Sequence, residues 1–151
     1  MRRAFSLLEI IFVLGLIAVL ISIILPSFQG IQDESKFTKV RTELAVIQAA
    51  LERYYHKFRD YPQDTATYQD VLINETAYFN KTYTDPFRSA EPVYEYHYYP
   101  ASSRKYYLLI SPGINRQRET DPIENVNPSQ GTLVIPVGSD DIIITNLKLV
   151  E

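Results

Sequence analysis

A single acidic residue, Glu9, interrupts an otherwise apolar run over residues 5–25 near the start of the chain. A helix needs roughly 20 apolar residues to span the hydrocarbon core of a bilayer, and this run has about that many. A carboxylate inside that core costs a few kcal/mol, so it is seldom found there without a partner. The run therefore predicts a membrane-length helix, and Glu9 predicts a positive charge that meets it.

Two ordinary explanations of the run must be weighed. The basic leader, with Arg2 and Arg3, would also begin a plain membrane anchor or a cleaved secretory signal. A secretory signal has a shorter apolar core of about 7–15 residues, followed by a small-x-small cleavage site. Residues 26–30 (Pro-Ser-Phe-Gln-Gly) offer no such site. Neither explanation accounts for Glu9, and the physics alone leaves an anchor, a signal and a specialised segment all open.

The leader, the Ala4-Phe5 junction, Glu9 and the Pro26 that closes the run resemble the class III signal of type IV pilins and type II secretion pseudopilins. The family pattern is Gly-Phe-Thr-Leu-Ile-Glu, and this chain reads Ala-Phe-Ser-Leu-Leu-Glu. The resemblance implies that a prepilin peptidase cuts between Ala4 and Phe5 and methylates the new amine of Phe5. Ala4 is a departure, because the family has glycine there.

The resemblance also implies a role for Glu9 in assembly. After cleavage, Phe5 carries an ammonium group that Glu9 of a neighbouring subunit can pair with inside a bundle of low dielectric constant, where charge attraction is strong. Removing one member of such a pair leaves the other charge buried without a partner, which destabilises the assembly by about 3–5 kcal/mol. Pro26 has no N–H to donate, so it predicts a kink or local unwinding of the helix. The alternative is that Pro26 simply ends the membrane helix.

Length and composition limit the rest of the chain. The 151 residues allow one compact domain plus the anchor. The net charge of −3 becomes −5 when Arg2 and Arg3 are removed, before the new amine is counted. An acidic chain is a poor candidate for sequence-independent nucleic-acid binding, which needs clustered basic residues. Cysteine is absent, so no disulfide closes a C-terminal loop as it does in many adhesive pilins.

An amphipathic helix is expected after Pro26, because apolar residues recur there at spacings of three and four. This stripe consists of Phe37, Val40, Leu44, Ile47, Leu51, Tyr54 and Phe58. The helix should end near Asp60, since the residue before a proline disfavours the α region. The expected parts are a cleaved leader (1–4), a hydrophobic transmembrane or filament-core helix (5–26), an amphipathic helix (27–60) and a C-terminal αβ-loop and β-sheet region (61–151).

The C-terminal region predicts a small antiparallel sheet laid on the amphipathic helix, which makes the fold class α+β and similar to type IV pilins. A short helical turn is expected at 68–73 and a loop over 74–92. Extended segments are expected at residues 93–99, 104–111, 133–137 and 141–149. Pro136 suits the edge of a sheet. Alternating tyrosines at 94, 96 and 98 could stack bases or sugars, but they more often cover the sheet or meet a neighbouring subunit.

Residues 107–115 and 139–142, with the Asp-Pro-aromatic turn at 85–87, resemble the major pseudopilin of type II secretion. In that subfamily a loop between the last strands binds calcium, which implies a Ca²⁺ site at Asp140, Asp141 and Asn115. Calcium takes six to eight oxygen ligands, so two carboxylates and loop carbonyls are adequate. Residues 116–138 form an insertion relative to the family loop. The alternative is that Asp140 and Asp141 only cap a turn before a strand.

No motif of an enzyme is found. His56 and His97 lie in different predicted elements without a second ligand at metal spacing, and hydrolase and phosphate-loop motifs are absent. The resemblance to pseudopilins implies a structural subunit of a type II secretion pseudopilus, a periplasmic filament that drives protein export. The alternatives are a pilin of a type IV pilus, for adhesion, motility or DNA uptake, and a membrane-anchored binding domain. The implied partners are copies of the chain, other pseudopilins, prepilin peptidase and an assembly platform. The implied location is the bacterial inner membrane, with the N-terminus cytoplasmic and the C-terminal domain periplasmic.

Overall fold

The computed structural model of the protein describes residues 6–63, 65–88, 92–100 and 104–150, with the backbone alone at 26–29. The chain divides into two compact units, Met1–Lys36 and Phe37–Glu151. Helix α1 (Leu7–Phe58) begins in the first unit and ends in the second. It is one element across Pro26, so the idea that this proline ends the helix is wrong. The predicted kink at Pro26 stays a prediction.

In the first unit, the part of α1 from Ile10 to Leu25 carries apolar residues on every side. Each large apolar side chain from Leu7 to Leu25 is between 43 and 80 % exposed. Among the described residues, α1 is the one helix that is long and apolar enough to cross a bilayer. A helix with this pattern has no partner within its own unit and must find one in lipid or in other helices.

In the second unit, α1 buries the predicted stripe. Val40, Leu44, Ile47 and Leu51 are fully buried, as the spacing predicts. The prediction is wrong for Phe58, which is 42 % exposed. The physical reason is that α1 ends at Phe58 and the backbone turns away at once, because the next residue has a left-handed φ of 61°.

A second helix, α2 (Tyr68–Thr76), is longer than the turn predicted at 68–73 and takes three residues from the predicted loop. The side chain of Gln69 connects α2 to that loop, since its amide oxygen accepts the N–H of Tyr83 at 2.7 Å and its amide nitrogen donates to the Tyr83 carbonyl at 3.1 Å. These two bonds satisfy the buried amide of Gln69 and hold the loop against α2.

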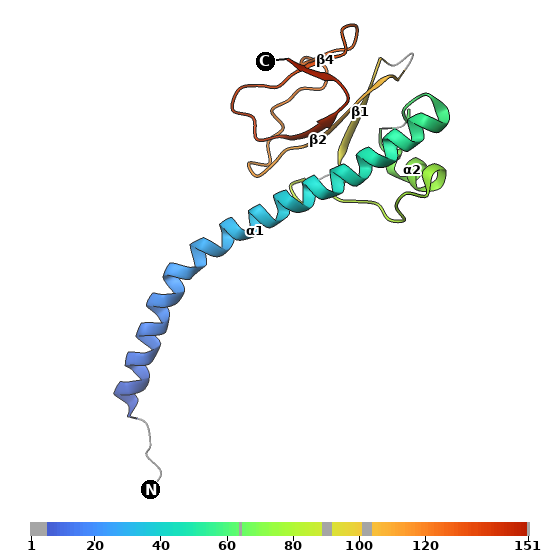
Figure 1. The fold of residues 1–151 in the computed structure, drawn as a ribbon. Coiled ribbons are helices and arrows are strands. Elements are labelled where there is room, and N and C mark those ends of the chain that lie inside the picture. Colours follow the sequence, from blue (N-terminus) through green and yellow to red (C-terminus); the bar gives the residue numbers. More distant parts are fainter. Residues whose placement is uncertain (1–5, 64, 89–91, 101–103, 151) are drawn as a thin grey trace. The chain divides into compact units, whose positions relative to one another are not determined.

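In the part of the chain that the structure describes, six strands form two small sheets. The first is antiparallel and contains β1 (Glu95–Tyr99), β2 (Tyr106–Ser111) and β5 (Ile142–Thr145), in the order β1-β2-β5. The second contains β3 (Val126–Asn127), β4 (Thr132–Val134) and β6 (Lys148–Val150), in the order β3-β4-β6. Figure 1 shows β1 and β2 beside the part of α1 that belongs to this unit. The fold is therefore α+β, with a long N-terminal helix and a small antiparallel sheet, as predicted.

The sheets differ from the prediction in three details. Strand β3 was not predicted, because two residues are too few to show alternation. Strands β4 and β6 pair in parallel, a pairing that needs no tight hairpin. Pro136 lies beyond the end of β4 and not at a sheet edge. A proline cannot donate to a ladder, which is consistent with a strand that ends before it.

The core of the second unit is rich in tyrosine. Tyr94 and Tyr96 are buried, as the interpretation of these residues as a sheet cover predicts. The ring of Tyr96 stacks on Tyr68 with centroids 4.6 Å apart. The hydroxyls of Tyr94 and Tyr96 both have acceptors. Tyr94 donates to Glu43 Oε2 at 2.7 Å, and Tyr96 donates to the Pro62 carbonyl at 2.9 Å. The core thus combines apolar area with satisfied polar tips.

Candidate metal centre

The pairing of β2 with β5 brings together two segments that are far apart in the sequence. Ser111, the last residue of β2, pairs with Ile142, the first residue of β5. The chain that leaves β2 therefore lies beside the chain that enters β5. Residues 113–120 come from the first segment, and Asp140 and Asp141 come from the second.

Backbone N–H groups of the first segment bind the two aspartates. The N–H of Asn115 donates to Asp140 Oδ2 at 3.0 Å. The N–H groups of Glu119 and Thr120 both donate to Asp141 Oδ2, at 3.0 and 2.6 Å. One oxygen of each aspartate is thus used to fix the position of its carboxylate.

The other oxygens of these carboxylates are left without a partner. Asp140 Oδ1 and Asp141 Oδ1 are buried, and neither has a hydrogen-bond donor among the described residues. A buried polar atom without a partner costs free energy, so such atoms call for an explanation. Asp140, Asp141 and Glu119 each offer an oxygen, and these oxygens lie within 4.8 Å of one another. Calcium–oxygen distances of about 2.3–2.6 Å place two ligands of one ion at most roughly 5 Å apart. The cluster therefore fits a calcium ion.

Glu119 is held in this cluster by two further bonds. Its Oε2 accepts the N–H of Asp140 at 2.9 Å, and its Oε1 accepts the side-chain amide of Asn115 at 2.9 Å. Within the part of the chain that the structure describes, none of Glu119, Asp140 and Asp141 forms an ion pair with a basic side chain. Three carboxylates without a protein cation repel one another. A divalent ion bound between them would replace this repulsion with attraction to the ion.

A glycine makes the close approach of the two segments possible. Gly113 has a φ of +64°, and a Cβ placed there would lie 2.3 Å from the carbonyl oxygen of Asp140. Any other residue would have to push the two segments apart. Gly113 is therefore required by both its backbone conformation and its contact.

The three residues predicted as calcium ligands take different positions relative to the acidic cluster. Asp140 and Asp141 lie together, since each has a carboxylate oxygen within 4.8 Å of one of the other. Asn115 is adjacent, but its amide nitrogen is bonded to Glu119 and its oxygen accepts the N–H of Gln117 at 2.7 Å. Glu119 was missed, because it lies in the insertion 116–138. Its acidic side chain within a loop rich in turn residues was the one signal that could have found it.

The remaining predicted site residues lie in the first unit. Ala4 and Phe5 fall outside the described residues, so the cleavage site stays a prediction. Glu9 lies in the first turn of α1 and is exposed, and its N–H donates to the carbonyl of Ser6 at 3.1 Å. Among the described residues Glu9 has no cationic partner, so the predicted partner stays a prediction.

Comparison with known families gives a match over about two thirds of the chain. Residues 28–126 match the family of the type II secretion system (T2SS), protein G. Neither the curated proteins nor the solved structures gave a match. The matched stretch begins after the apolar run, so it is evidence independent of the signal motif around Glu9. It includes Glu119 but stops before Asp140.

Proposed function

Because this chain belongs to the type II secretion system protein G family, the major pseudopilin, we propose that it is the repeating subunit of a periplasmic filament that drives protein export. The family is structural, so the role of the chain is that of a pseudopilin and not of an enzyme. One observation carries the proposal: the large apolar side chains of Leu7–Leu25 are exposed, whereas the second unit has a core of its own. In a pseudopilin these apolar side chains would be covered by lipid before assembly and by neighbouring helices after it.

Maturation of the subunit would begin at its N-terminus. The apolar helix fits an inner-membrane anchor, and Arg2 and Arg3 favour a cytoplasmic N-terminus. Prepilin peptidase would cut between Ala4 and Phe5 and methylate the amine of Phe5. The mature chain would then pass to an assembly platform in the inner membrane and join copies of itself and other pseudopilins.

Glu9 would set the position of each subunit in the filament. Its carboxylate lies near the start of α1, where the amine of a neighbouring Phe5 can reach it when the helices bundle. In a bundle without water, this pair would be strong and intolerant of a shifted register. The proposed role is therefore the choice of register rather than the stability of one subunit.

The acidic cluster would hold one calcium ion. Glu119, Asp140 and Asp141 would supply carboxylate ligands, and Asn115 would orient Glu119 through the bond at 2.9 Å. The ion would supply two positive charges that link the segment after β2 to the segment before β5. In a chain without cysteine, this link would do what a disulfide does in other pilins, by closing a long loop.

Mass analysis of the protein purified from its native inner membrane tests the filament proposal. We expect a chain that begins at Phe5 with a methylated amine, and filaments in electron micrographs of cells that overproduce it. A chain that keeps Met1 would indicate an ordinary anchor. A chain cut after Pro26 would indicate a secreted domain, and either result would contradict the proposal.

Thermal unfolding of the full-length protein in detergent micelles tests the calcium proposal. We expect Ca²⁺ to raise the midpoint, and a chelator to remove that increase, because an ion that binds only the folded state stabilises it. Asp141→Asn should abolish the increase. Asp121→Asn is the matched control: it removes the same charge from the segment after β2, whose backbone binds Asp141, but Asp121 caps a turn by accepting the N–H of Ile123 at 2.7 Å. Equal responses to Ca²⁺ in the two variants would contradict the assignment.

A further inference from the structure

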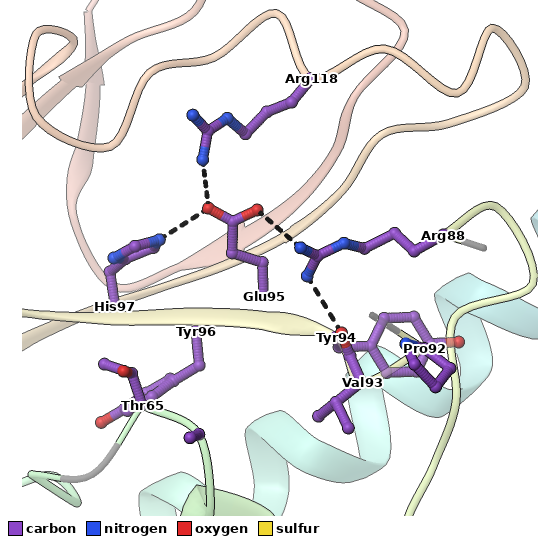
Figure 2. Close-up of a pocket in the computed structure, with 10 residues that line it drawn as sticks. Thr65, Arg88, Pro92, Val93, Tyr94, Glu95, Tyr96, His97 and Arg118 are labelled. Atoms are coloured by element: carbon purple, nitrogen blue, oxygen red, sulfur yellow. Dashed lines mark hydrogen bonds and ion pairs between the residues drawn. The ribbon is translucent and has the colours of Figure 1, made fainter. Parts of the chain in front are cut away.

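A second charged cluster lies on strand β1, around Glu95 (Figure 2). Glu95 Oε1 accepts hydrogen bonds from His97 Nε2 at 2.8 Å and from an Arg118 guanidinium nitrogen at 2.5 Å. A guanidinium nitrogen of Arg88 lies 3.7 Å from Glu95 Oε2. Three side chains that can carry positive charge thus surround one carboxylate, and they come from three separate parts of the chain.

This cluster lines a hollow of about 570 Å³. The cationic side chains contact Glu95 and do not point into the open hollow. Their positive charge is therefore paired with the Glu95 carboxylate. The side chain of Glu95 is only 16 % exposed. Burial opposes its ionisation, but the hydrogen bonds from His97 and Arg118 outweigh burial and lower the pKa of Glu95 below its usual value. Glu95 is therefore a fixed anion to which the loop after β2 is bound.

The bond from Arg118 to Glu95 lies one residue from the metal centre. Arg118 precedes Glu119, whose carboxylate belongs to the acidic cluster, and Thr120, whose N–H binds Asp141 at 2.6 Å. The arginine is bound to β1 while the next two residues are bound to the segment before β5. The ion pair thus fixes one side of the short stretch that presents Glu119.

We propose that the Arg118–Glu95 pair is a positioning element of the calcium site: it holds the loop against β1 so that Glu119 is in place before the ion arrives. This inference rests on the proposed calcium site. Partners that orient metal ligands without touching the metal typically change its affinity by 10- to 100-fold. Since this pair is partly exposed, with Arg118 42 % exposed, we expect an effect of about tenfold, at the lower end of that range.

The sign of the effect separates positioning from simple electrostatics. Arg118 is a positive charge near a cation site, so its loss should strengthen calcium binding if only charge matters. Its loss should weaken binding if the arginine positions Glu119. Arg116→Gln is the matched control for charge, because Arg116 is exposed on the same loop and its side chain makes no hydrogen bond or ion pair with the described residues.

The experiment is calorimetric titration of Ca²⁺ into the full-length protein in detergent micelles, for the natural chain and for each variant. We expect Arg116→Gln to bind as tightly as the natural chain or slightly more tightly. Arg118→Gln should bind about tenfold more weakly, and Arg118→Lys should recover part of the loss because it keeps the ion pair but not the planar fork. Glu95→Gln should also weaken binding, and the double variant should lose less than the sum of the two single losses.

Two results would contradict the inference, and they differ from each other. If the natural chain binds calcium and Arg118→Gln matches Arg116→Gln, the positioning role is wrong and the metal centre stands. If the natural chain gives neither heat nor a thermal shift with Ca²⁺, the metal centre itself is wrong and the inference falls with it. Hydrogen exchange of residues 113–120 without calcium gives a second readout: faster exchange in Arg118→Gln than in Arg116→Gln is expected, and equal rates would oppose the proposal.

Discussion

Helix α1 contains two stretches of apolar residues that meet opposite conditions. Leu16, in the first unit, is 54 % exposed, whereas Leu44, in the second unit, is fully buried. Both belong to one continuous helix, and both are leucine. The first stretch has no partner within its unit, while the second packs against a sheet and against α2. The second stretch is therefore stabilised by packing within its own unit, whereas the first depends on lipid or on other helices.

This difference shows where the apolar side chains of each stretch become buried. The second unit buries its stripe within one chain, so it should fold before assembly. The first stretch is satisfied only by lipid or by other helices, so the proposed function requires its environment to change when a subunit leaves the membrane for a filament. A structural protein that moves between two environments needs one unit that does not depend on either.

Glu9→Leu is expected to have the largest effect, because it removes the polar residue that marks the first stretch. Filaments should disappear from electron micrographs, since the amine of a neighbouring Phe5 loses its partner. The unfolding midpoint of the second unit should not change, because Glu9 belongs to the other unit. Filaments of normal abundance would show that Glu9 is not needed for assembly.

Alkaline pH should unfold the second unit and spare the first. Burial comes first among the causes that raise the pKa of seven tyrosines above the ordinary value near 10: Tyr54, Tyr61, Tyr68, Tyr94, Tyr96, Tyr99 and Tyr107. A raised folded pKa gives stability that is complete below pH 10 and is lost as pH rises beyond it. Near-ultraviolet circular dichroism and tyrosinate absorbance in micelles should therefore change together above pH 10.

The first unit contains no tyrosine and is the internal control for this titration. Its helical signal in the far ultraviolet should persist when the tyrosine signal of the second unit is lost. Gradual ionisation of all tyrosines near pH 10 without an unfolding step would contradict the buried positions of these rings.

Leu44→Ala should destabilise the second unit by about 2–5 kcal/mol, the usual range for a fully buried leucine. The cost combines lost burial with the cavity that remains, because Leu44 has no exposed surface. Leu16→Ala is the matched control and should leave the urea unfolding of the second unit unchanged. Equal effects of the two substitutions would mean that the two stretches are not independent.

Tyr94→Phe should have the smallest effect, about 1–2 kcal/mol in urea unfolding. The phenol donates to Glu43 Oε2 at 2.7 Å, and the carboxylate would lose that donor while the ring stays in place. Tyr78→Phe is the control, because Tyr78 is 48 % exposed. A loss as large as that of Leu44→Ala would show that the bond supports more of the core than its own two groups.

Periodicity allowed the long elements to be predicted, and contacts between distant segments decided the short ones. The spacing from Phe37 to Leu51 was enough to predict a helix and its buried face. Strand β3 has two residues and exists because it pairs with β4, so no local signal marks it. Phe58 continues the stripe in sequence but not in space, because the chain leaves the helix there.

The metal centre shows the same division. Asp140 and Asp141 could be predicted because the segments around them resemble the major pseudopilin, in which a loop between the last strands binds calcium. Glu119 could not, because its place in the cluster depends on the register of β2 with β5 and not on its distance in the sequence. The contact between Arg118 and Glu95, 23 positions apart, depends likewise on the register of β1 with β2, in which Glu95 pairs with Ile110 shortly before the loop that carries Arg118.

The sequence by itself determined the membrane-length helix, its amphipathic continuation and the absence of disulfides, and it predicts a partner for Glu9. These are properties of composition and of spacing along one element, which local physical chemistry controls. The tertiary structure alone decided which carboxylates share a site, which glycine permits their approach, and which arginine holds the loop. Those results depend on strand pairing, because a pairing register places side chains from distant segments within a few ångströms of one another.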